Sequence, residues 1–324
     1  MVQKRQIEAS RAHRFGFPLL DNFALMSFAC AIEPLRAANF LSGRKLYEWL
    51  YVSNGAKVAT ASSGLQVRVD HTISDAVRFD TILVCAGGNP TLYDDRKTIA
   101  WLRRQARAGC SIGGISGGPY ILAKAGLLDH ARCTIHWEHF PAFVEAFPDI
   151  EVTRNLFELD AKRVTCGGGI AALDMMHAII RRDHGQAFAS QVSDWFLQTS
   201  VRMGTAGQRI SLRERIGSSN RSLLSAIEAM ERHIAQPKDR ASLAKLAGVS
   251  VRQLERLFAR HLGTTMNHHY LSLRLAKAQV LLRQTSLPVV QIASECGFSD
   301  ASHFAKAYRR AFGISPSGDR IASH

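Results

Sequence analysis

The feature that most constrains the fold of this chain is a sequence that occurs twice near its end. The first copy, SLAKLAGVSVRQLERLFARHLG, covers residues 242–263, and the second, QIASECGFSDASHFAKAYRRAFG, covers residues 291–313. Three small residues recur at an offset of 49, in the pairs Ala244 and Ala293, Gly248 and Gly297, Ser250 and Ser299. Gly263 recurs as Gly313 at an offset of 50, so the second turn is one residue longer. The repeat predicts two similar helical hairpins.

Each copy has the pattern of two helices joined by a tight turn. A small alanine lets two helices approach closely, and a glycine permits the turn that ends the first helix. We expect Ser250 and Ser299 to cap the second helix of each copy. Apolar residues at helical spacing predict the buried face of these helices, which comprises Leu254, Leu257, Phe258, Phe304, Tyr308 and Phe312.

The opposite face of each second helix is polar and mostly basic. It carries Arg252, Gln253, Glu255, Arg256 and Arg260 in the first copy, and Ser302, His303, Lys306, Arg309 and Arg310 in the second. Such helices fit the major groove of DNA, where Arg and Gln contact base edges and other basic groups hold phosphates. The alternative is a helical domain that binds another protein.

The charge of the chain is concentrated in the same region. From Thr205 onward there are 18 Lys and Arg against 8 Asp and Glu, whereas residues 1–204 contain 23 and 19. A solvated basic surface would explain this charge alone. Together with the tandem repeat it favours double-stranded DNA as the partner.

The segment 224–320 resembles the AraC-type DNA-binding domain, and its end, RRAFGISPSGDR, resembles the closing sequence of that family. The resemblance implies two helix-turn-helix units joined by a central helix over about 266–284. It also implies base contacts from Arg252, Glu255, Arg256, Ala301, Ser302 and Lys306. The residues of the second unit, Ala301, Ser302 and Lys306, are a weak set for contacting bases. The second unit could therefore instead be a scaffold or contact RNA polymerase. Asp319 departs from the family, which has an aromatic residue before Arg320, so we expect looser packing of the last helix.

Residues 14–200 alternate short apolar runs with helical stretches such as 97–108 and 171–182. Expected strands are residues 14–19, 49–54, 81–86, 110–115 and 163–166. This order predicts an α/β fold, a parallel sheet with helices on both faces, followed by an all-α domain.

These patterns divide the chain into four parts. We expect a disordered arm over residues 1–12, an α/β domain over 13–202, a polar linker over 203–222 and the DNA-binding domain over 223–324. No apolar run reaches about 18 residues, so no membrane contact is expected. The six scattered cysteines do not resemble a secreted disulfide framework, so we expect a cytoplasmic protein.

The sequence GISGG over residues 114–118 matches the G-x-S-x-G nucleophile elbow. Taken alone it indicates a serine hydrolase, with Ser116 activated by His136 and the latter oriented by Asp174 or Glu138. The alternative is that the elbow is a binding turn whose backbone amides, at a helix N-terminus, hold a carboxylate.

The surrounding sequence resembles the DJ-1/PfpI branch of the class I glutamine amidotransferase-like proteins, which have a flavodoxin-like sandwich fold. The similar segments are LVCAGG (83–88), the elbow, TIHW (134–137) and TCGGGIAALDMM (165–176). Enzymes of that family have a Cys at the elbow, a His after it and an acid near the first helix. This chain has Ser116, Gly117 and Ser27 at these positions, so the resemblance implies no catalytic residues and no cofactor.

The spacing of Cys133, His136 and His139 could bind a metal, but no second ligand cluster accompanies it, so no metal is expected.

The two domains in this order resemble AraC-family regulators with an amidotransferase-like sensor domain, similar to regulators of glycine betaine, carnitine and arginine catabolism. The resemblance implies a homodimeric activator that works with RNA polymerase and responds to a small zwitterionic or cationic metabolite. Candidate effector-binding residues are Glu33, Ser116, Gly117, His136 and Trp137. Glu33 could instead pair with Arg36 or face a dimer interface, and Trp137 could be a core aromatic residue.

Two other functions stay open at this point. One is an amidase or hydrolase that uses Ser116 and is fused to a DNA-binding module. The other is a constitutive DNA-binding protein whose N-terminal domain is purely structural.

Overall fold

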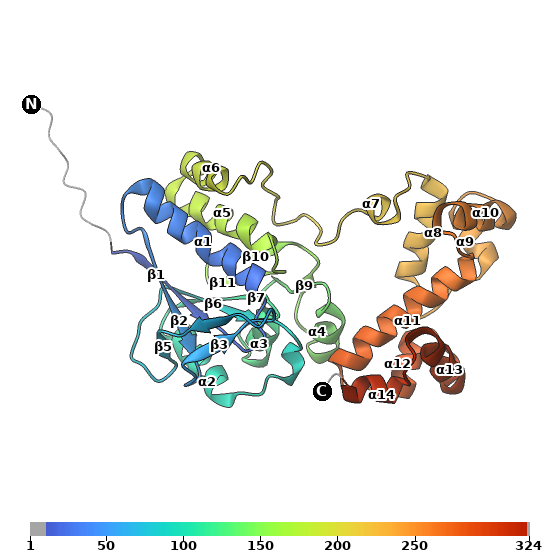
Figure 1. The fold of residues 1–324 in the computed structure, drawn as a ribbon, viewed down its shortest axis with the longest axis horizontal. Helices are drawn as coiled ribbons and strands as arrows, with labels where there is room; N and C mark the ends of the chain where they lie inside the picture. Colours follow the sequence, from blue (N-terminus) through green and yellow to red (C-terminus); the bar gives the residue numbers. More distant parts are fainter. Residues whose placement is uncertain (1–10, 323–324) are drawn as a thin grey trace, which may run out of the picture. The chain divides into compact units, whose positions relative to one another are not determined.

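A computed structural model describes residues 11–322. Within it the chain forms two compact units, the first ending at Gln208 and the second beginning at Arg209 (Figure 1). The arm predicted over residues 1–12 lies outside the described residues, except for Arg11 and Ala12. In the part of the chain between residues 11 and 322, no helix is long and apolar enough to cross a membrane.

The first unit is built on a seven-stranded sheet in the order β10-β11-β7-β6-β1-β2-β5. Its strands are β1 (His13–Pro18), β2 (Tyr47–Ser53), β5 (His71–Thr72), β6 (Thr81–Ala86), β7 (Ser111–Ser116), β10 (Phe157–Leu159) and β11 (Arg163–Cys166). All neighbouring strands are parallel except β10, which pairs antiparallel with β11 at the edge. The parallel sheet is thus confirmed with all five expected strands, while the short edge strands β5 and β10 were not predicted.

Helices cover both faces of this sheet, as predicted (Figure 1). One core contains side chains of α1 (Leu25–Ser42), α5 (Ala171–His184) and α6 (Gln186–Trp195), and the other those of α2 (Arg96–Arg107), α3 (Gly118–Lys124) and α4 (Phe140–Ala146). Along β6, Leu83 and Cys85 enter the first core, whereas Ile82 and Val84 enter the second. A strand buried on both faces must be apolar throughout, which explains the uninterrupted apolar run at this position.

The first unit also contains short strands and one short 3-10 helix outside this sheet. They are β3 (Val58–Thr60) with β4 (Gln66–Arg68), η1 (Pro90–Leu92), and β8 (Cys133–Thr134) with β9 (Val152–Thr153).

The second unit is entirely helical in its described part, as predicted. Its helices are α7 (Leu212–Ile216), α8 (Arg221–Arg232), α9 (Arg240–Leu246), α10 (Val251–Leu262), α11 (Met266–Gln284), α12 (Val289–Glu295), α13 (Ala301–Phe312) and α14 (Pro316–Ala322). The N-terminal half of α11 packs into a core with α8, α9 and α10, and its C-terminal half into a second core with α12 and α13 (Figure 1). The long helix α11 therefore joins two helix-turn-helix units, at the position expected for the central helix.

The two sequence copies fold alike. Leu254 and Phe258 of α10, like Phe304 and Tyr308 of α13, are completely buried. The turn glycines Gly248 and Gly297 have φ angles of 69° and 74°, a left-handed conformation that glycine adopts without strain.

The caps of the two second helices differ. Ser250 caps α10 and its hydroxyl accepts a hydrogen bond from the Gln253 amide. Asp300, not Ser299, caps α13 by accepting from the amides of Ser302 and His303. The expectation for Ser299 is wrong because the longer second turn moves the cap by one residue.

The segment predicted as a linker, residues 203–222, makes contacts at both ends. The Leu156 amide donates to the Gly204 carbonyl in the first unit. In the second unit α7 packs on α8, with the Arg215 guanidinium 3.0 Å from the Glu231 carboxylate. The chain passes from one unit to the other after Gln208.

The last helix is held by the residue that departs from the family. Asp319 is 3% exposed, and its carboxylate accepts hydrogen bonds from Tyr308, Gln279 and Arg283. The expected loosening of α14 is therefore wrong, because these hydrogen bonds replace the contacts of an aromatic ring.

Candidate nucleic-acid interface and elbow site

The exposed faces of α10 and α13 carry most of the residues predicted to contact DNA. The apolar residues on the opposite face of each helix are buried, so the polar side chains point to solvent. The exposed set comprises Arg252, Gln253, Arg256, Arg260, Ser302, His303, Lys306, Arg309 and Arg310. Ala301 is half-buried at the start of α13.

Glu255 on α10 already has partners within the protein. Its carboxylate accepts a hydrogen bond from the Met266 amide, at 3.3 Å, and lies 3.5 Å from the Arg240 guanidinium. This places a negative charge at the N-terminus of α11, where the helix dipole favours it. Glu255 therefore stabilises the junction of α10 and α11, which competes with a role in contacting bases.

Gln253 is also partly engaged. Its side-chain oxygen accepts hydrogen bonds from the backbone and hydroxyl groups of Ser250, at 2.9 and 3.0 Å. The amide nitrogen of Gln253 stays on the exposed face, so the side chain can offer a donor to DNA.

The elbow in the first unit has the backbone geometry that its sequence predicts. Ser116 ends β7 with a φ of 61°, and α3 begins two residues later. A Cβ atom at Gly118 would lie 2.1 Å from the Val84 carbonyl oxygen, and one at Gly114 would lie 2.5 Å from the Pro119 nitrogen. Only glycine fits at both positions, so the sharp strand–turn–helix connection requires these two glycines.

Ser116 is almost covered, with 6% of its surface exposed. Gly168 packs on it so closely that a Cβ atom there would lie 2.8 Å from the Ser116 Cβ and 2.7 Å from the Ser27 hydroxyl. Ser27 in turn accepts a hydrogen bond of 2.6 Å from the Gly169 amide. The structure thus brings Ser27 to the elbow, as the resemblance implied.

The geometry does not activate Ser116 as a nucleophile. Within residues 11–322 its hydroxyl makes no hydrogen bond, and the hydrogen bond between His136 and Ser116 joins their backbones, from the His136 amide to the Ser116 carbonyl oxygen at 3.3 Å. The His136 Nδ1 accepts from the Glu138 amide. Burial lowers the pKa of His136, against the opposing charge of Glu138. A base in contact with the hydroxyl, which a reactive serine needs, is not in place.

Asp174 does not orient His136. It is 1% exposed, and Arg202 and Gln198 donate to its carboxylate at 2.6 to 3.0 Å. Its function in this structure is to hold the segment that follows α6 against α5.

Some of the backbone amides at the predicted anion site, at the start of α3, already have partners within the protein. The Gly117 amide donates to the Ala86 carbonyl and the Tyr120 amide to the Gly117 carbonyl, both at 3.1 Å. Pro119 has no N–H group. Several amides at the start of this seven-residue helix are thus engaged or absent, and the carboxylate site stays a prediction.

Two other candidate effector residues lie at the surface. Glu33 and Arg36 form an ion pair of 2.6 Å and are equally exposed, so the alternative in which they pair with each other is confirmed. Glu33 lies six residues, or about 9 Å along the helix, from Ser27. Trp137 is 43% exposed and its ring centroid lies 5.4 Å from that of His136, so it is not a core residue.

The possible metal ligands do not form a metal site. Cys133 lies inside the core below α3 and α4, and its pKa is raised to about 12 by burial. Among the residues that the structure describes, no group of three His, Cys, Asp or Glu side chains could hold a metal ion.

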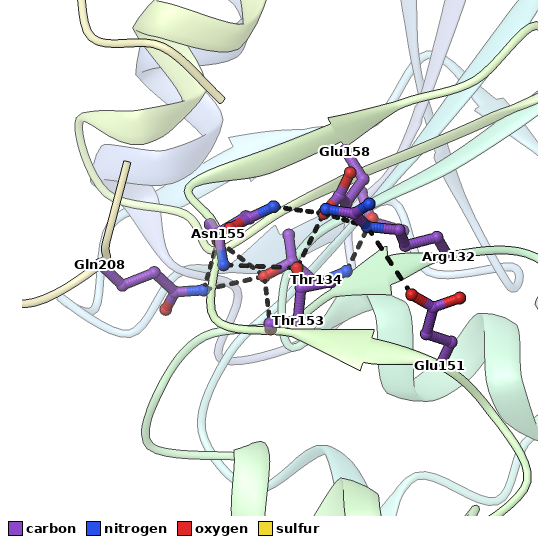
Figure 2. A network of polar contacts seen from close by, with 8 residues as sticks. Arg132, Thr134, Glu151, Thr153, Asn155, Glu158 and Gln208 are labelled. Carbon is purple, nitrogen blue, oxygen red and sulfur yellow. Dashed lines mark hydrogen bonds and ion pairs between the residues drawn. The ribbon is translucent and has the colours of Figure 1, made fainter. Parts of the chain in front are cut away.

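A polar network that the sequence did not indicate lies at the end of the first unit. Figure 2 shows Gln208 reaching toward Thr134 and Asn155. The Gln208 Nε2 lies 2.9 Å from the Thr134 hydroxyl and 2.8 Å from each of the carbonyl oxygens of Ile135 and Asn155. A Cβ atom at Gly167 would lie 2.7 Å from the Gln208 Cδ. These contacts fix the last residue of the first unit in one position, which we call the seat of Gln208 and which Thr134, Ile135, Asn155 and Gly167 form. A glutamine in a polar, glycine-rich segment gives no sign of these contacts in the sequence.

The network continues through charged residues at the surface. Asn155 and Thr153 donate to the Glu158 carboxylate at 2.6 and 2.8 Å, and Arg132 lies 3.2 Å from the same carboxylate (Figure 2). These contacts hold the strand ends that form the seat of Gln208.

Comparisons with known proteins agree with both parts of the chain. The helix-turn-helix domain family matches residues 243–320, and the DJ-1/PfpI family matches residues 17–182. A solved structure of an AraC family transcriptional regulator from Pseudomonas putida has 26% sequence identity and a TM-score of 0.52, and covers 57% of this chain and 99% of that chain.

Two curated relatives match over almost the whole chain. The HTH-type transcriptional regulator GlxA of Rhizobium meliloti (strain 1021) is 46% identical over 317 residues, which are 98% of each protein. The HTH-type transcriptional regulator GbdR of Pseudomonas aeruginosa is 41% identical over 305 residues, 94% of this chain and 83% of that protein. These relatives are named as transcriptional regulators and not as enzymes. The chain belongs to the family of DNA-binding transcriptional regulators in which a DJ-1/PfpI domain precedes an AraC-type helix-turn-helix domain.

Proposed function

We propose that this regulator is controlled by a small nitrogen-containing metabolite, zwitterionic or cationic, that binds beside the elbow of the DJ-1/PfpI domain. The observation that carries the proposal is the seat of Gln208. Its side chain contacts Ile135 and Gly167. The next residue in each of these segments lies against Ser116. A ligand that enters at the elbow must move at least one of these segments, because Ser116 is almost covered. Movement there acts directly on the residue where the chain leaves the sensor domain.

The effector would contact the elbow through Ser116 and Gly117 and the facing segment through His136 and Trp137. The exposed indole of Trp137 can cover a cationic group, an interaction worth about 0.5–2 kcal/mol. Glu33 would contribute through its negative charge only if its pairing with Arg36 is released.

On DNA, the proposal assigns base contacts to Arg252 and Arg256 of α10, with Gln253 donating and Arg260 holding phosphate. In α13 the contacts are those of Ala301, Ser302, His303, Lys306 and Arg310. Ala301 can offer only apolar contact, such as to a thymine methyl group. Glu255 contributes by its position at the start of α11 rather than by a free carboxylate.

The proposal includes activation through RNA polymerase, a homodimer and a cytoplasmic location. Two aromatic side chains support the dimer, since Phe40 of α1 and Trp195 of α6 are 65% and 45% exposed with ring centroids 5.0 Å apart. Glu33 and Arg36 lie on the same helix, and a two-fold axis could set them against Arg36 and Glu33 of a second copy.

The test begins with thermal unfolding of the full chain in the presence of glycine betaine, carnitine and arginine as probes. A ligand that binds the folded state raises the melting temperature by mass action. DNA affinity is then measured with and without that ligand, on a fragment that the protein itself selects from random duplex DNA.

The variant that tests the coupling is Gln208→Ala. We expect it to keep the ligand-induced rise in melting temperature but to lose the change in DNA affinity that the ligand causes. Gln186→Ala is the control, because Gln186 makes a single surface hydrogen bond to Ser190. A Gln208→Ala protein that responds to the ligand like the wild type would refute the coupling.

A further inference from the structure

The two helix-turn-helix units touch each other through the turn of the second one. The Gly297 Cα faces the loop between α8 and α9, and a Cβ atom there would lie 2.5 Å from the Ile234 carbonyl oxygen and from the Pro237 Cγ. The equivalent glycine of the first turn, Gly248, has no atom within 4 Å of a Cβ position. The close approach is therefore a property of the second turn alone and not a general requirement of the hairpin.

Arg274 holds the second turn in this position. It lies on α11, and its guanidinium donates to the carbonyl oxygens of Cys296 at 2.7 Å and Gly297 at 2.8 Å. The same group lies 4.0 Å from the centroid of the Phe298 ring. Two hydrogen bonds and a stacked ring fix both the distance and the rotation of the turn relative to α11, because the guanidinium is planar and its donors have fixed directions.

Tyr270, one turn earlier on α11, holds the other side of the contact. Its hydroxyl donates to the His233 carbonyl at 2.7 Å and accepts from the Lys238 amide at 3.3 Å. The loop 233–238 and the turn 296–298 are thus attached to α11 at neighbouring positions and pressed against each other. The central helix alone would leave each unit attached to one of its halves, with separate cores.

We infer that Arg274 is a positioning residue for DNA binding, which sets the separation and rotation between the recognition helices α10 and α13. It does so by locking the second turn against the first unit, with no contact to DNA required. This inference rests on the DNA-binding function of the chain and not on effector control, and no effector is used in its test. Its consequence is a strict spacing between the two DNA segments that one chain recognises.

The strictness follows from the geometry of the duplex. Two recognition helices on one side of DNA meet successive major grooves about 34 Å, or one helical turn, apart. Adding one base pair between the two segments moves the second by about 3.4 Å and rotates it by roughly 35°. A rigid junction cannot follow this change, whereas a loosened junction can.

The experiment uses the full chain and DNA selected by the wild-type protein from a random duplex pool. Affinity is measured on the selected sequence and on versions with one base pair added or removed between its two halves. We expect the wild type to lose on the order of tenfold in affinity on the altered spacings, and Arg274→Ala to lose less than about threefold between spacings. On the selected sequence Arg274→Ala should bind roughly tenfold more weakly, because its two helices are no longer preorganised.

Matched variants separate positioning from general damage. Lys277→Ala removes a positive charge from the same helix and a bond to the Glu295 carbonyl only, and it should keep the wild-type dependence on spacing. Gly297→Ala and Gly248→Ala impose similar backbone strain, since both glycines have φ near 70°, but only Gly297→Ala forces the units apart. Gly297→Ala should lose the spacing dependence and Gly248→Ala should keep it.

The inference is overturned if the affinity of Arg274→Ala and Gly297→Ala depends on spacing as that of the wild type does. It is likewise overturned if these two variants and the two controls, Lys277→Ala and Gly248→Ala, all lose the dependence on spacing equally. It is also overturned if the wild type selects a single short segment and shows no dependence on spacing. Should Arg274→Ala fail to fold by circular dichroism, the glycine pair decides the question.

Discussion

The hydroxyl of Tyr308 donates a hydrogen bond to the carboxylate of Asp319 inside the last helical core. Tyr308 is completely buried and Asp319 is 3% exposed, so the bond is shielded from water. Burial raises the pKa of Tyr308 and the adjacent Asp319 raises it further, so the phenol remains a donor throughout the physiological range. The Arg283 guanidinium, 2.9 Å from the same carboxylate, balances its charge and ties α14 to α11.

Asp319→Ala is predicted to destabilise the second unit strongly. The substitution leaves the Tyr308 hydroxyl buried without this acceptor and removes the anion beside Arg283. Losing one partner of such a buried pair costs about 3 kcal/mol. Chemical unfolding followed by circular dichroism checks this, with Asp300→Ala as a control that removes an exposed helix cap worth about 1 kcal/mol. Equal losses for the two variants would show that the Asp319 contacts contribute no more than a cap.

The helical unit was predictable because each local requirement is visible in the sequence. Two turn glycines at positive φ, a small alanine and a buried face at helical spacing all recur in the second copy. The prediction that Ser299 caps the second helix is wrong because the second turn is one residue longer than the first. Asp319 was misjudged because a sequence does not show which donors will surround a carboxylate, and three residues from two other helices converge on it.

The elbow was predictable as a turn but not as a site. Gly114 and Gly118 determine the backbone there, and this requirement is local. The seat of Gln208 and the position of Arg274 depend on contacts between segments far apart in the chain, which no local pattern encodes. Arg274 is half-buried on a helix that also carries the basic residues Lys277 and Arg283, so the sequence does not single it out.

Arg252→Ala and Arg256→Ala are predicted to weaken DNA binding in a sequence-dependent manner. Each side chain is exposed on α10, and losing a contact to a base edge costs about 1–3 kcal/mol of discrimination. Affinities for selected and random duplexes at several salt concentrations check this. Arg232→Ala on α8, whose side chain is 65% exposed, is the control. Equal losses on selected and random DNA would mean that the two arginines hold phosphates.

The first unit is predicted to lose stability in mild acid because of His177. This residue is 7% exposed and its Nδ1 lies 2.8 Å from the Ser193 hydroxyl. Burial, followed by the charge of Arg181, lowers the pKa of His177 below its usual value of 6.5, although Asp174 acts in the opposite direction.

The unfolded chain therefore binds a proton that the folded chain resists, so the stabilisation is complete above about pH 6.5 and is lost as the pH falls through the lowered pKa. Melting temperatures between pH 7.5 and 5.0 should fall less steeply for His177→Gln than for the wild type. His71→Gln, at a surface site beside Asp75, should behave like the wild type. A slope unchanged by His177→Gln would contradict the assignment.

Gly118→Ala is predicted to prevent folding of the first unit at ordinary temperature. The added Cβ atom would lie 2.1 Å from a backbone carbonyl oxygen of β6, which cannot move without breaking the sheet. Gly169→Ala is the matched control, because Gly169 has a φ of 56° and open space around its Cβ position. The control should lose only about 1 kcal/mol from backbone strain. Soluble yield and circular dichroism compare the two, and a well-folded Gly118→Ala protein would refute the tight elbow.

Ser116 itself is predicted to bind without reacting. Its hydroxyl has no hydrogen-bonded base among residues 11–322, so Ser116→Ala should keep the effector response or shift only the concentration at which it occurs. Gly117→Trp should abolish the response while DNA binding persists, because a Cβ atom at Gly117 already lies 3.2 Å from Pro90 and an indole would fill the space beside the elbow. The two variants are compared by ligand-induced changes in melting temperature and in DNA affinity. Purified wild type and Ser116→Ala are also assayed for turnover of small amides and esters. Turnover by the wild type that disappears in Ser116→Ala would show that the elbow is catalytic and that control by a bound metabolite is the wrong account of this domain.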